Sequence, residues 1–530
     1  MALMDSPRCS ATTPRQKAPA SARATHPNFR ATPPMMSPIS GQALPTAREV
    51  YSPPLAAPRP THDVVSSGGG SWRKGVLLVL AGLLTACATP HGTSKASTRD
   101  EDGVWRSRGY GWLLSVTPEG MRLHQETAAG CYADPSSTAE LKEMFGLQEP
   151  GPSADVRDFF GAPGETRYRF DRVPALPAGC DTPRTWNALE LFDVFRATFA
   201  EHYAAFPQRA PDWLARLDAQ RSRVTPDMDG RSLFTLFADA LRSLNDAHVG
   251  LMADTLTYEP HPTGTFELLE QASRAMQRPV RDVQREWMRA YRDGILQTVL
   301  RGEGHHVGNQ RVLWGFAAPR VGYLNLLTMG GFVAGEEGQT PTLAQELAAL
   351  EPVLDEALTA FAGADAVILD VSNNRGGHDA VARAVAERFT ARPRRAYSKW
   401  ATGAKDVPPQ EFTLQPSPRP SFHGPVYVVT SDVTVSAGEV LTLALRALPN
   451  VIHVGTATRG AFSDMLMKPL PNGWTVHLSN EHYADARGQD HEARGLPPQR
   501  PLEIFKSEDL WHSHAQALRA LADSLVPPRP

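Results

Sequence analysis

Val426-Tyr427-Val428-Val429-Thr430, an apolar and β-branched run, leads into Ser436-Ala437-Gly438-Glu439. Apolar residues at helical spacing fill 440–448, so the pattern predicts a strand followed by a helix that begins at Ser436. A serine at this junction lies beside the free backbone N–H groups of the first helical turn, which can hold an oxyanion. The alternative is that Ser436 is only a helix N-cap, a position that serine often takes.

Strand-like and helical patterns alternate on both sides of this stretch, from about residue 311 onward. Such alternation predicts an α/β domain, in which helices cover a largely parallel sheet. Pro352 interrupts the helical pattern of 343–361, and we expect a kink or a boundary there. The expected strands are 320–326, 366–371, 426–430, 451–454 and 474–478, and the expected helices are 343–361, 380–389 and 436–448.

The rest of the chain divides by its periodicity into further regions. Short apolar runs separated by Gly and Pro predict a small β-rich domain over 101–182. Aromatic and aliphatic residues at helical spacing predict a helical subdomain over 183–310, and we assign its aromatic residues to core packing. We place the α/β domain at 311–506, followed by a C-terminal helix and tail over 507–530.

Composition excludes several function classes. The chain has 530 residues, 41% of them hydrophobic and 21% charged, with a formal net charge of -3. No strong field therefore favours nucleic acid or an anionic membrane surface. Neither a CxxC pair nor an HExxH motif occurs, and His305-His306 is interpreted as an exposed pair, so we expect no metal and no other cofactor.

The N-terminal region contains a targeting pattern in an unusual place. Residues 1–60 contain twelve prolines, and we interpret 1–70 as a disordered or mis-annotated extension. Residues 71–87 resemble a bacterial lipoprotein signal, because a basic pair and a short apolar run precede Cys87, the expected lipidated residue. A miscalled start near Val64 or Val65 would explain the offset. The alternative is a small buried strand or helix that happens to precede a cysteine, and 88–100 are interpreted as a linker.

Two further cysteines, Cys131 and Cys180, remain inside the β-rich region. Export would place them in an oxidising compartment, where a disulfide persists, and a small domain benefits from such a bond. We therefore predict a Cys131–Cys180 disulfide. The alternative is a pair of buried, reduced cysteines that pack as small apolar groups.

Four separated motifs resemble those of a known family when they are read together. They are Asp246-Ala247-His248, Leu369-Asp370-Val371-Ser372-Asn373-Asn374-Arg375-Gly376-Gly377, Ser436-Ala437-Gly438-Glu439 and Glu492-Ala493-Arg494-Gly495-Leu496-Pro497-Pro498. In this order, over about 185–506, they resemble the tricorn-core and C-terminal processing (tail-specific) serine peptidases. The resemblance implies a crotonase-like catalytic fold.

The resemblance also implies a role for each matched residue. Ser436 corresponds to the nucleophile, His248 to the general base and Glu492 to the carboxylate that orients the imidazole. Gly376, Gly377 and the N–H of Ala437 correspond to the oxyanion hole, and the sequence leaves open which glycine donates. His378 and His491 neighbour these motifs, and we place them outside the triad.

Departures from the family pattern favour one catalytic style. Relatives with a Ser–Lys dyad carry a lysine where Thr458-Arg459-Gly460-Ala461-Phe462 stands here, so the Ser-His-Glu type is favoured. A peptide-binding PDZ module is not recognisable between 250 and 310. The last motif continues as Pro498-Gln499 where the family usually has Pro-Asp.

These observations predict a serine peptidase that acts on a peptide or protein substrate. We expect it in the bacterial cell envelope, tethered through lipid on Cys87, with the outer membrane as its destination. One alternative is a non-catalytic ligand carrier on the same fold, similar to the retinoid-binding proteins of the eye. A crotonase-type acyl-CoA enzyme is a third possibility, which the export signal disfavours.

Overall fold

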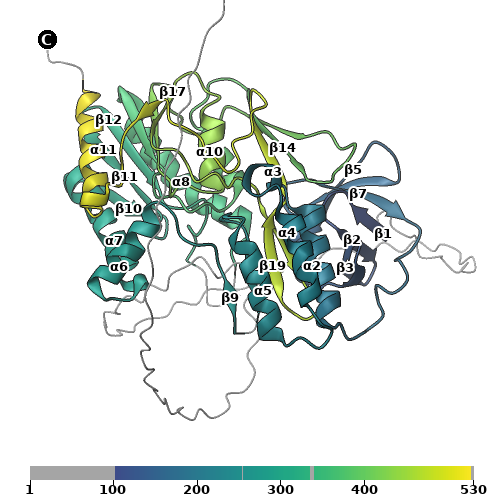
Figure 1. Ribbon diagram of the computed structural model, residues 1–530. Helices are drawn as coiled ribbons and strands as arrows, with labels where there is room; N and C mark the ends of the chain where they lie inside the picture. The colour runs from purple at the N-terminus through teal and green to yellow at the C-terminus, as the bar shows by residue number, and fades with distance from the viewer. Residues whose placement is uncertain (1–101, 254, 335–339, 527–530) are drawn as a thin grey trace, which may run out of the picture. The chain divides into compact units, whose positions relative to one another are not determined.

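The computed structural model describes residues 102–253, 255–334 and 340–526, all of which lie in one compact unit, Gly82–Pro530 (Figure 1). The predictions for 1–70, for the signal 71–87 with Cys87 and for the linker 88–100 fall outside the described residues. No helix in the described part of the chain is long and apolar enough to cross a membrane.

The largest α/β element is a seven-stranded sheet with the order β10-β11-β12-β13-β16-β17-β21. The first three strands pair antiparallel, and the run from β12 to β21 is parallel. This mixed sheet confirms the predicted α/β class. Its strands are β10 (His305–Val307), β11 (Val312–Ala318), β12 (Val321–Leu326), β13 (Ala366–Asp370), β16 (Val426–Thr430), β17 (Val451–Gly455) and β21 (Arg500–Pro501).

Helices cover both faces of this sheet, because alternate residues of each strand point to opposite sides. Val367 and Leu369 of β13 pack into the core formed with α8, α9 and α10, whereas Ile368 packs into the core formed with η3 and α11. The near-continuous apolar strands follow from burial on both faces. The covering helices are α8 (Leu343–Ala360), η4 (Phe361–Gly363), α9 (Asp379–Glu387), α10 (Ala437–Leu445), the π-helix η3 (Gly294–Val299), η5 (Ser507–Asp509) and α11 (Ser513–Ser524).

Pro352 lies inside α8, which continues through it from Leu343 to Ala360. Pro352 therefore does not mark the helix boundary that was one of the two outcomes expected from the sequence. Proline removes one backbone donor from a helix. Buried Leu350, Leu354 and Leu358 anchor the helix to the sheet on both sides of the proline.

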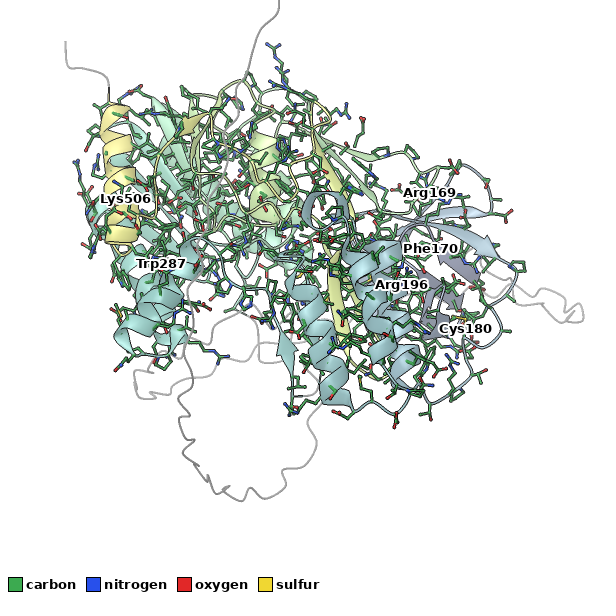
Figure 2. All side chains as sticks on the ribbon, in the orientation of Figure 1. Arg169, Phe170, Cys180, Arg196, Trp287 and Lys506 are labelled. Carbon is green, nitrogen blue, oxygen red and sulfur yellow. A yellow bond between two sulfur atoms is a disulfide. The ribbon has the colours of Figure 1, made fainter. Side chains whose placement is uncertain are left out.

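A second seven-stranded sheet, fully antiparallel, has the order β4-β3-β2-β1-β7-β6-β5. A helix that the sequence analysis missed, α1 (Thr138–Phe145), is capped by Ser137 with a reciprocal bond from Glu140. The strands are β1 (Gly103–Ser107), β2 (Trp112–Thr117), β3 (Gly120–Thr127), β4 (Gly130–Ala133), β5 (Leu147–Pro150), β6 (Val156–Phe160) and β7 (Tyr168–Val173). Phe170 and Arg169 mark β7 in Figure 2.

One hydrophobic core joins this sheet to the helices that follow it. Trp105 and Trp112 belong to the same cluster as Phe195, Phe237 and Leu478. The sheet and the helices therefore do not have separate cores. The helices and short strands of this part are α2 (Ala188–His202), α3 (Phe206–Arg209), α4 (Trp213–Gln220), η2 (Arg221–Arg223), α5 (Gly230–Arg242), β8 (Gly250–Met252), β9 (Thr257–Tyr258), β18 (Met465–Pro469) and β19 (Thr475–Ser479).

The remaining elements extend these layers. Trp287 of α7 is buried, donates its indole N–H to Leu510 O at 3.1 Å and packs against Phe505 (Figure 2). The elements are α6 (Thr265–Met276), α7 (Val280–Asp293), β14 (Arg394–Ala401), β15 (Gln410–Leu414) and β20 (Glu481–Asp485), the last three forming a sheet in the order β15-β14-β20.

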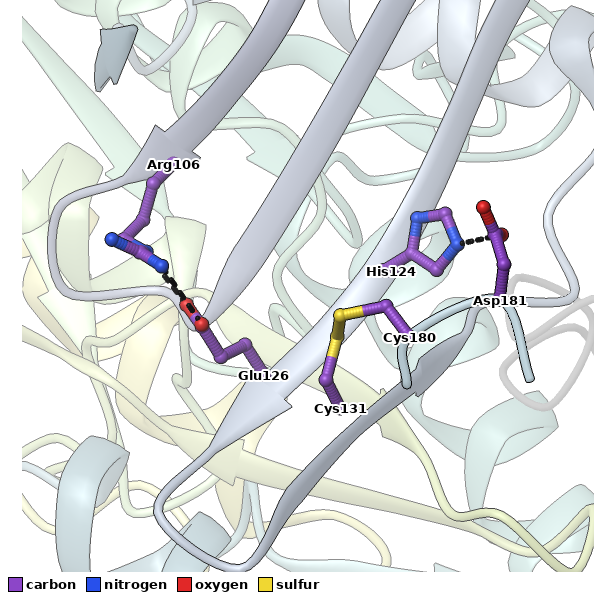
Figure 3. Close-up of a disulfide and its surroundings, with 6 residues drawn as sticks. All are labelled: Arg106, His124, Glu126, Cys131, Cys180 and Asp181. Atoms are coloured by element: carbon purple, nitrogen blue, oxygen red, sulfur yellow. Dashed lines mark hydrogen bonds and ion pairs between the residues drawn. A yellow bond between two sulfur atoms is a disulfide. The ribbon is translucent and has the colours of Figure 1, made fainter. Parts of the chain in front are cut away.

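Cys131 of β4 and Cys180, in the loop after β7, form a disulfide with a Cα–Cα distance of 4.7 Å (Figure 3). Nearby, His124 Nε2 lies 2.7 Å from Asp181 Oδ1, which fixes the residue after Cys180 to strand β3. The disulfide attaches the loop that leads into α2 to the edge strand of the antiparallel sheet.

Replacing both cysteines, Cys131→Ser with Cys180→Ser, should lower the free energy of unfolding of the oxidised protein by about 4 kcal/mol. The disulfide closes a loop with a sequence separation of 49, and a loop of that length restricts the unfolded chain by roughly this amount. Urea denaturation followed by tryptophan fluorescence measures the difference. An unchanged midpoint and slope would show that the bond contributes no stability.

Candidate active site

Ser436 lies immediately before α10, and its backbone has φ 56° and ψ -128°. Positive φ is rare for a residue with a side chain and stores strain, as at the nucleophile turn of other hydrolases. Ser436 is half-buried, whereas Ala437 behind it is fully buried. Ser436 therefore keeps part of its surface exposed at the start of the helix.

Glu439, one turn into α10, holds the strained turn in place. Its carboxylate accepts the N–H of Gly460 at 2.7 Å, of Ala461 at 2.8 Å and of Ser436 at 3.3 Å. Ser436 N also donates to Ala461 O at 3.1 Å. Burial raises the pKa of Glu439 to about 7, although the backbone donors act in the opposite direction.

The Gly376-Gly377 turn lies against Ser436. A Cβ atom at Gly376 would lie 2.7 Å from Ser436 Cβ, so only glycine fits so close to the serine. The Gly376 N–H already donates to Asn374 Oδ1 at 2.9 Å. Among the described residues, the N–H groups of Gly377 and Ala437 have no acceptor, so these two are available to an oxyanion.

His248 follows α5 in a buried turn that Asp246 organises. Asp246 Oδ1 accepts the His248 N–H at 2.9 Å, and its Oδ2 accepts the Tyr203 hydroxyl at 2.9 Å. His477 Nδ1 donates to the carbonyl of His248 at 3.0 Å. The Nδ1 atom of His248 is sealed from solvent without a partner in the described part of the chain. Burial, which outweighs the attraction of Asp246, lowers the pKa of His248 below its ordinary value.

Glu492 is buried beside the loop after β17 and makes no direct hydrogen bond with His248. Its Oε2 accepts the N–H of Phe462 at 3.0 Å, and its Oε1 accepts from Arg209 Nη2 at 2.9 Å. Burial and the nearby charge of Asp246 raise the pKa of Glu492 above its ordinary value. That Glu492 orients the imidazole stays a prediction.

The sequence analysis missed Arg209, which lies at the end of α3. Its guanidinium donates to Asn245 O at 2.5 Å and to Gly460 O at 2.5 Å, besides Glu492. Its Nε lies 3.5 Å from Asp246 Oδ2. The hint in the sequence is weak, because the only signal is an arginine after an aromatic helix, far from every motif.

A buried lysine, Lys399 of β14, is unsuited to act as a general base. Its Nζ donates to Asp464 Oδ2 at 2.9 Å, to Glu481 Oε2 at 3.1 Å and to Tyr483 OH at 3.0 Å. Burial alone would lower the pKa of Lys399, but Asp464 and Glu481 raise it well above its ordinary value. The amine therefore stays protonated, which is consistent with the absence of a lysine from the 458–462 motif.

The loop that carries Gly376-Gly377 begins at Asp370, the last residue of β13, and Asp370 is anchored from the far side of the sheet. Asp370 accepts from His514 Nε2 of α11 at 2.8 Å and from Tyr323 OH at 2.5 Å, while its Oδ1 accepts the Ser372 N–H at 2.9 Å. Asp370 and Ser436 both follow the carboxyl ends of neighbouring parallel strands, where open α/β sheets place their sites.

Comparisons with known proteins find peptidases that resemble part of this chain. The family model described as Peptidase family S41 matches residues 320–502. The carboxy-terminal processing protease CtpA of Bacillus subtilis is 27% identical over 143 residues, which are 27% of this chain and 29% of that protein. The chain thus spans less than a third of the length of this curated relative.

One solved structure shows the same fold. A crystal structure from Parabacteroides merdae matches with a TM-score of 0.51 and 22% identity, covering 64% of this chain and 98% of that one. Mature CPAF matches with a TM-score of 0.44 and 14% identity, covering 64% and 97%. The segment matched by the family model contains Gly376, Gly377, Ser436 and Glu492, whereas His248 precedes it. Over residues 320–502 this chain is therefore similar to peptidase family S41.

Proposed function

We propose that the chain is a serine peptidase that hydrolyses peptide bonds through an acyl-enzyme, with Ser436 as nucleophile and His248 as general base. The observation that carries this proposal is the strained, accessible Ser436 beside two unoccupied backbone donors, Gly377 N–H and Ala437 N–H. The family match adds independent support. A ligand carrier of the same fold would have no need for a strained serine facing free donors, so we do not favour it.

The proposed reaction gives each of these residues a role. Ser436 Oγ attacks the substrate carbonyl carbon while its proton passes to the imidazole of His248, and the carbonyl oxygen takes the negative charge. The N–H groups of Gly377 and Ala437 hold that oxygen. The imidazolium then protonates the leaving amine, which leaves an ester on Ser436. A water molecule, deprotonated by His248, hydrolyses the ester and restores the serine.

We extend the proposal to the setting of the reaction. Residues 311–506 would form a crotonase-like catalytic domain, and the substrate would be a peptide or protein cut towards its carboxyl end, by analogy with CtpA, a carboxy-terminal processing protease. Export and a lipid anchor on Cys87 would place the enzyme in the bacterial cell envelope, where the Cys131–Cys180 disulfide would persist.

Ser436→Ala should abolish labelling by a fluorophosphonate probe and lower peptide hydrolysis by several orders of magnitude, because the nucleophile and base act as a unit. Ser153→Ala, which alters an exposed serine in the turn between β5 and β6, is the matched control and should label as the parent does. In-gel fluorescence and a peptide-release assay measure the two effects. A folded Ser436→Ala protein with parental turnover would contradict the proposal.

The acid limb of the pH profile of kcat/KM should have its midpoint below 6.5. Only the neutral imidazole can accept the serine proton, and burial lowers the pKa of His248, so the neutral form persists to lower pH than in a free histidine. Initial rates between pH 4.5 and 8 at low substrate concentration give the midpoint, while circular dichroism confirms that the fold is intact. A midpoint above 6.5 would exclude His248, in this environment, as the base.

Mass spectrometry of protein extracted from the membranes of the native host should find a diacylglyceryl group on Cys87. The basic pair and apolar run before Cys87 are what the lipoprotein pathway recognises. Cys87→Ser, with the rest of the chain unchanged, should release the protein into the soluble fraction. Peptides from residues 1–60 in the mature protein would contradict cleavage at Cys87.

A further inference from the structure

Arg209 contacts Glu492, the turn that leads to His248 and the loop that Glu439 bonds to the Ser436 turn. It donates to Asn245 O, in the turn that leads to His248, and to Gly460 O, in the loop bound to the Ser436 turn by Glu439. It also donates to Glu492 Oε1. Its side chain is only 9% exposed, so this is an internal contact and not a surface ion pair.

In the described part of the chain, Arg209 provides a hydrogen-bonded link between Glu492 and the turn that carries His248. Glu492 uses its two oxygens for Arg209 and the Phe462 N–H. Arg209 Nε faces Asp246, and Asp246 accepts the backbone N–H of His248. The path from the carboxylate to the histidine segment therefore runs from Glu492 through Arg209 and Asp246.

We propose that Arg209 is a positioning residue of the reaction, through which Glu492 fixes the place of His248 relative to Ser436. This inference rests on the proposed function of Ser436 and His248. Arginine suits the position because its planar guanidinium group donates hydrogen bonds in several fixed directions at once, whereas a lysine ammonium is a compact point charge. The contacts to two carbonyls and one carboxylate come from three different loops, which no shorter side chain at 209 could reach together.

Arg209 also sets the charge around the histidine. The groups that face His248 are Asp246 from its own turn, Asp464 from the loop after Gly460, His477 from β19 and Arg209 from α3. Asp246 and Asp464 attract the imidazolium, whereas Arg209 and His477 oppose it. Loss of the Arg209 charge would leave Asp246 unneutralised, so His248 would take up its proton at higher pH.

Three variants test the proposal. Arg209→Gln removes the positive charge, and Arg209→Lys keeps the charge but removes the planar guanidinium group. The control, Arg216→Gln, removes an arginine that makes an exposed ion pair with Asp212 on neighbouring α4. Both Arg209 variants should lower kcat about 100-fold with little change in KM, because a displaced general base costs on the order of that factor. Arg216→Gln should behave as the parent does.

The titration of His248 separates positioning from a merely structural role. In Arg209→Gln, the acid limb of kcat/KM and the His248 imidazole resonance, identified by its loss in His248→Gln, should both titrate at higher pH than in the parent. In Arg209→Lys, the resonance should titrate close to the parent value while kcat stays low. An unchanged His248 titration in Arg209→Gln would overturn the proposal. This NMR measurement does not depend on hydrolysis, so its result stands even if Ser436 proves not to be a nucleophile.

A double-mutant cycle tests the route from Glu492. If Glu492 acts through Arg209, Glu492→Gln combined with Arg209→Lys should reduce kcat no further than the more damaging single variant does. If the reductions in kcat of the two single variants multiply in the double variant, the two residues act independently. That result would overturn the proposed route from Glu492 through Arg209. If Arg209→Gln fails to fold, Arg209→Lys and Glu492→Gln still decide the question through this cycle and through the His248 titration.

Discussion

The carboxylate of Glu439 is the constraint on which the site depends. It lies inside α10, has no exposed surface and accepts backbone N–H groups from Ser436, Gly460 and Ala461. One side chain thus binds the start of the helix to the loop after β17. A buried carboxylate is expensive unless donors surround it, and here the donors belong to the two segments that must meet. Because Glu439 fixes Gly460, it also fixes a carbonyl that Arg209 needs, so the geometry of the serine and that of the histidine segment share one anchor.

A second constraint is that two buried carboxyl groups, those of Asp246 and Glu492, have little positive charge near them. Asp246 and Glu492 share the guanidinium of Arg209, which favours the ionised form of both carboxyl groups. Burial alone would raise the pKa of Asp246, but Arg209 and His248 lower it, whereas Glu492 retains a raised pKa. Asp246 therefore remains the ionised partner nearest the histidine. Removing one member of such a buried set leaves an uncompensated charge, which is why we expect changes at 209 to act on the pH dependence as well as on the rate.

The periodicity of apolar residues was enough to predict the main strands and helices of the α/β domain. It did not predict the features of three residues, each for a physical reason. The expected strands 366–371, 426–430 and 451–454 correspond to β13, β16 and β17, because burial on both faces leaves a strong apolar signal. Pro352 did not end its helix, since tertiary packing outweighs a single missing donor. Positive φ at Ser436 has no sequence signature, because any side chain there is strained and only the surrounding bonds impose it. The contacts of Arg209 could not be predicted from the sequence for a different reason. Its partners are carbonyl and carboxyl groups from distant loops, and no local sequence pattern encodes such contacts.

The C-terminal helix α11 helps to hold the loop beside the proposed nucleophile. His514 of α11 reaches through the core to Asp370, and Asp370 in turn holds the Ser372 N–H at the start of the Gly376-Gly377 loop. The C-terminal helix is thereby bonded to the strand end that leads to the proposed oxyanion donors. A parallel sheet brings such loops to one edge but does not fix their backbone direction. Here that direction is set by buried polar bonds from both sides of the sheet, from Glu439 on the α10 face and from His514 on the α11 face. The active-site edge thus depends on polar contacts made by helices that lie on opposite faces of the sheet.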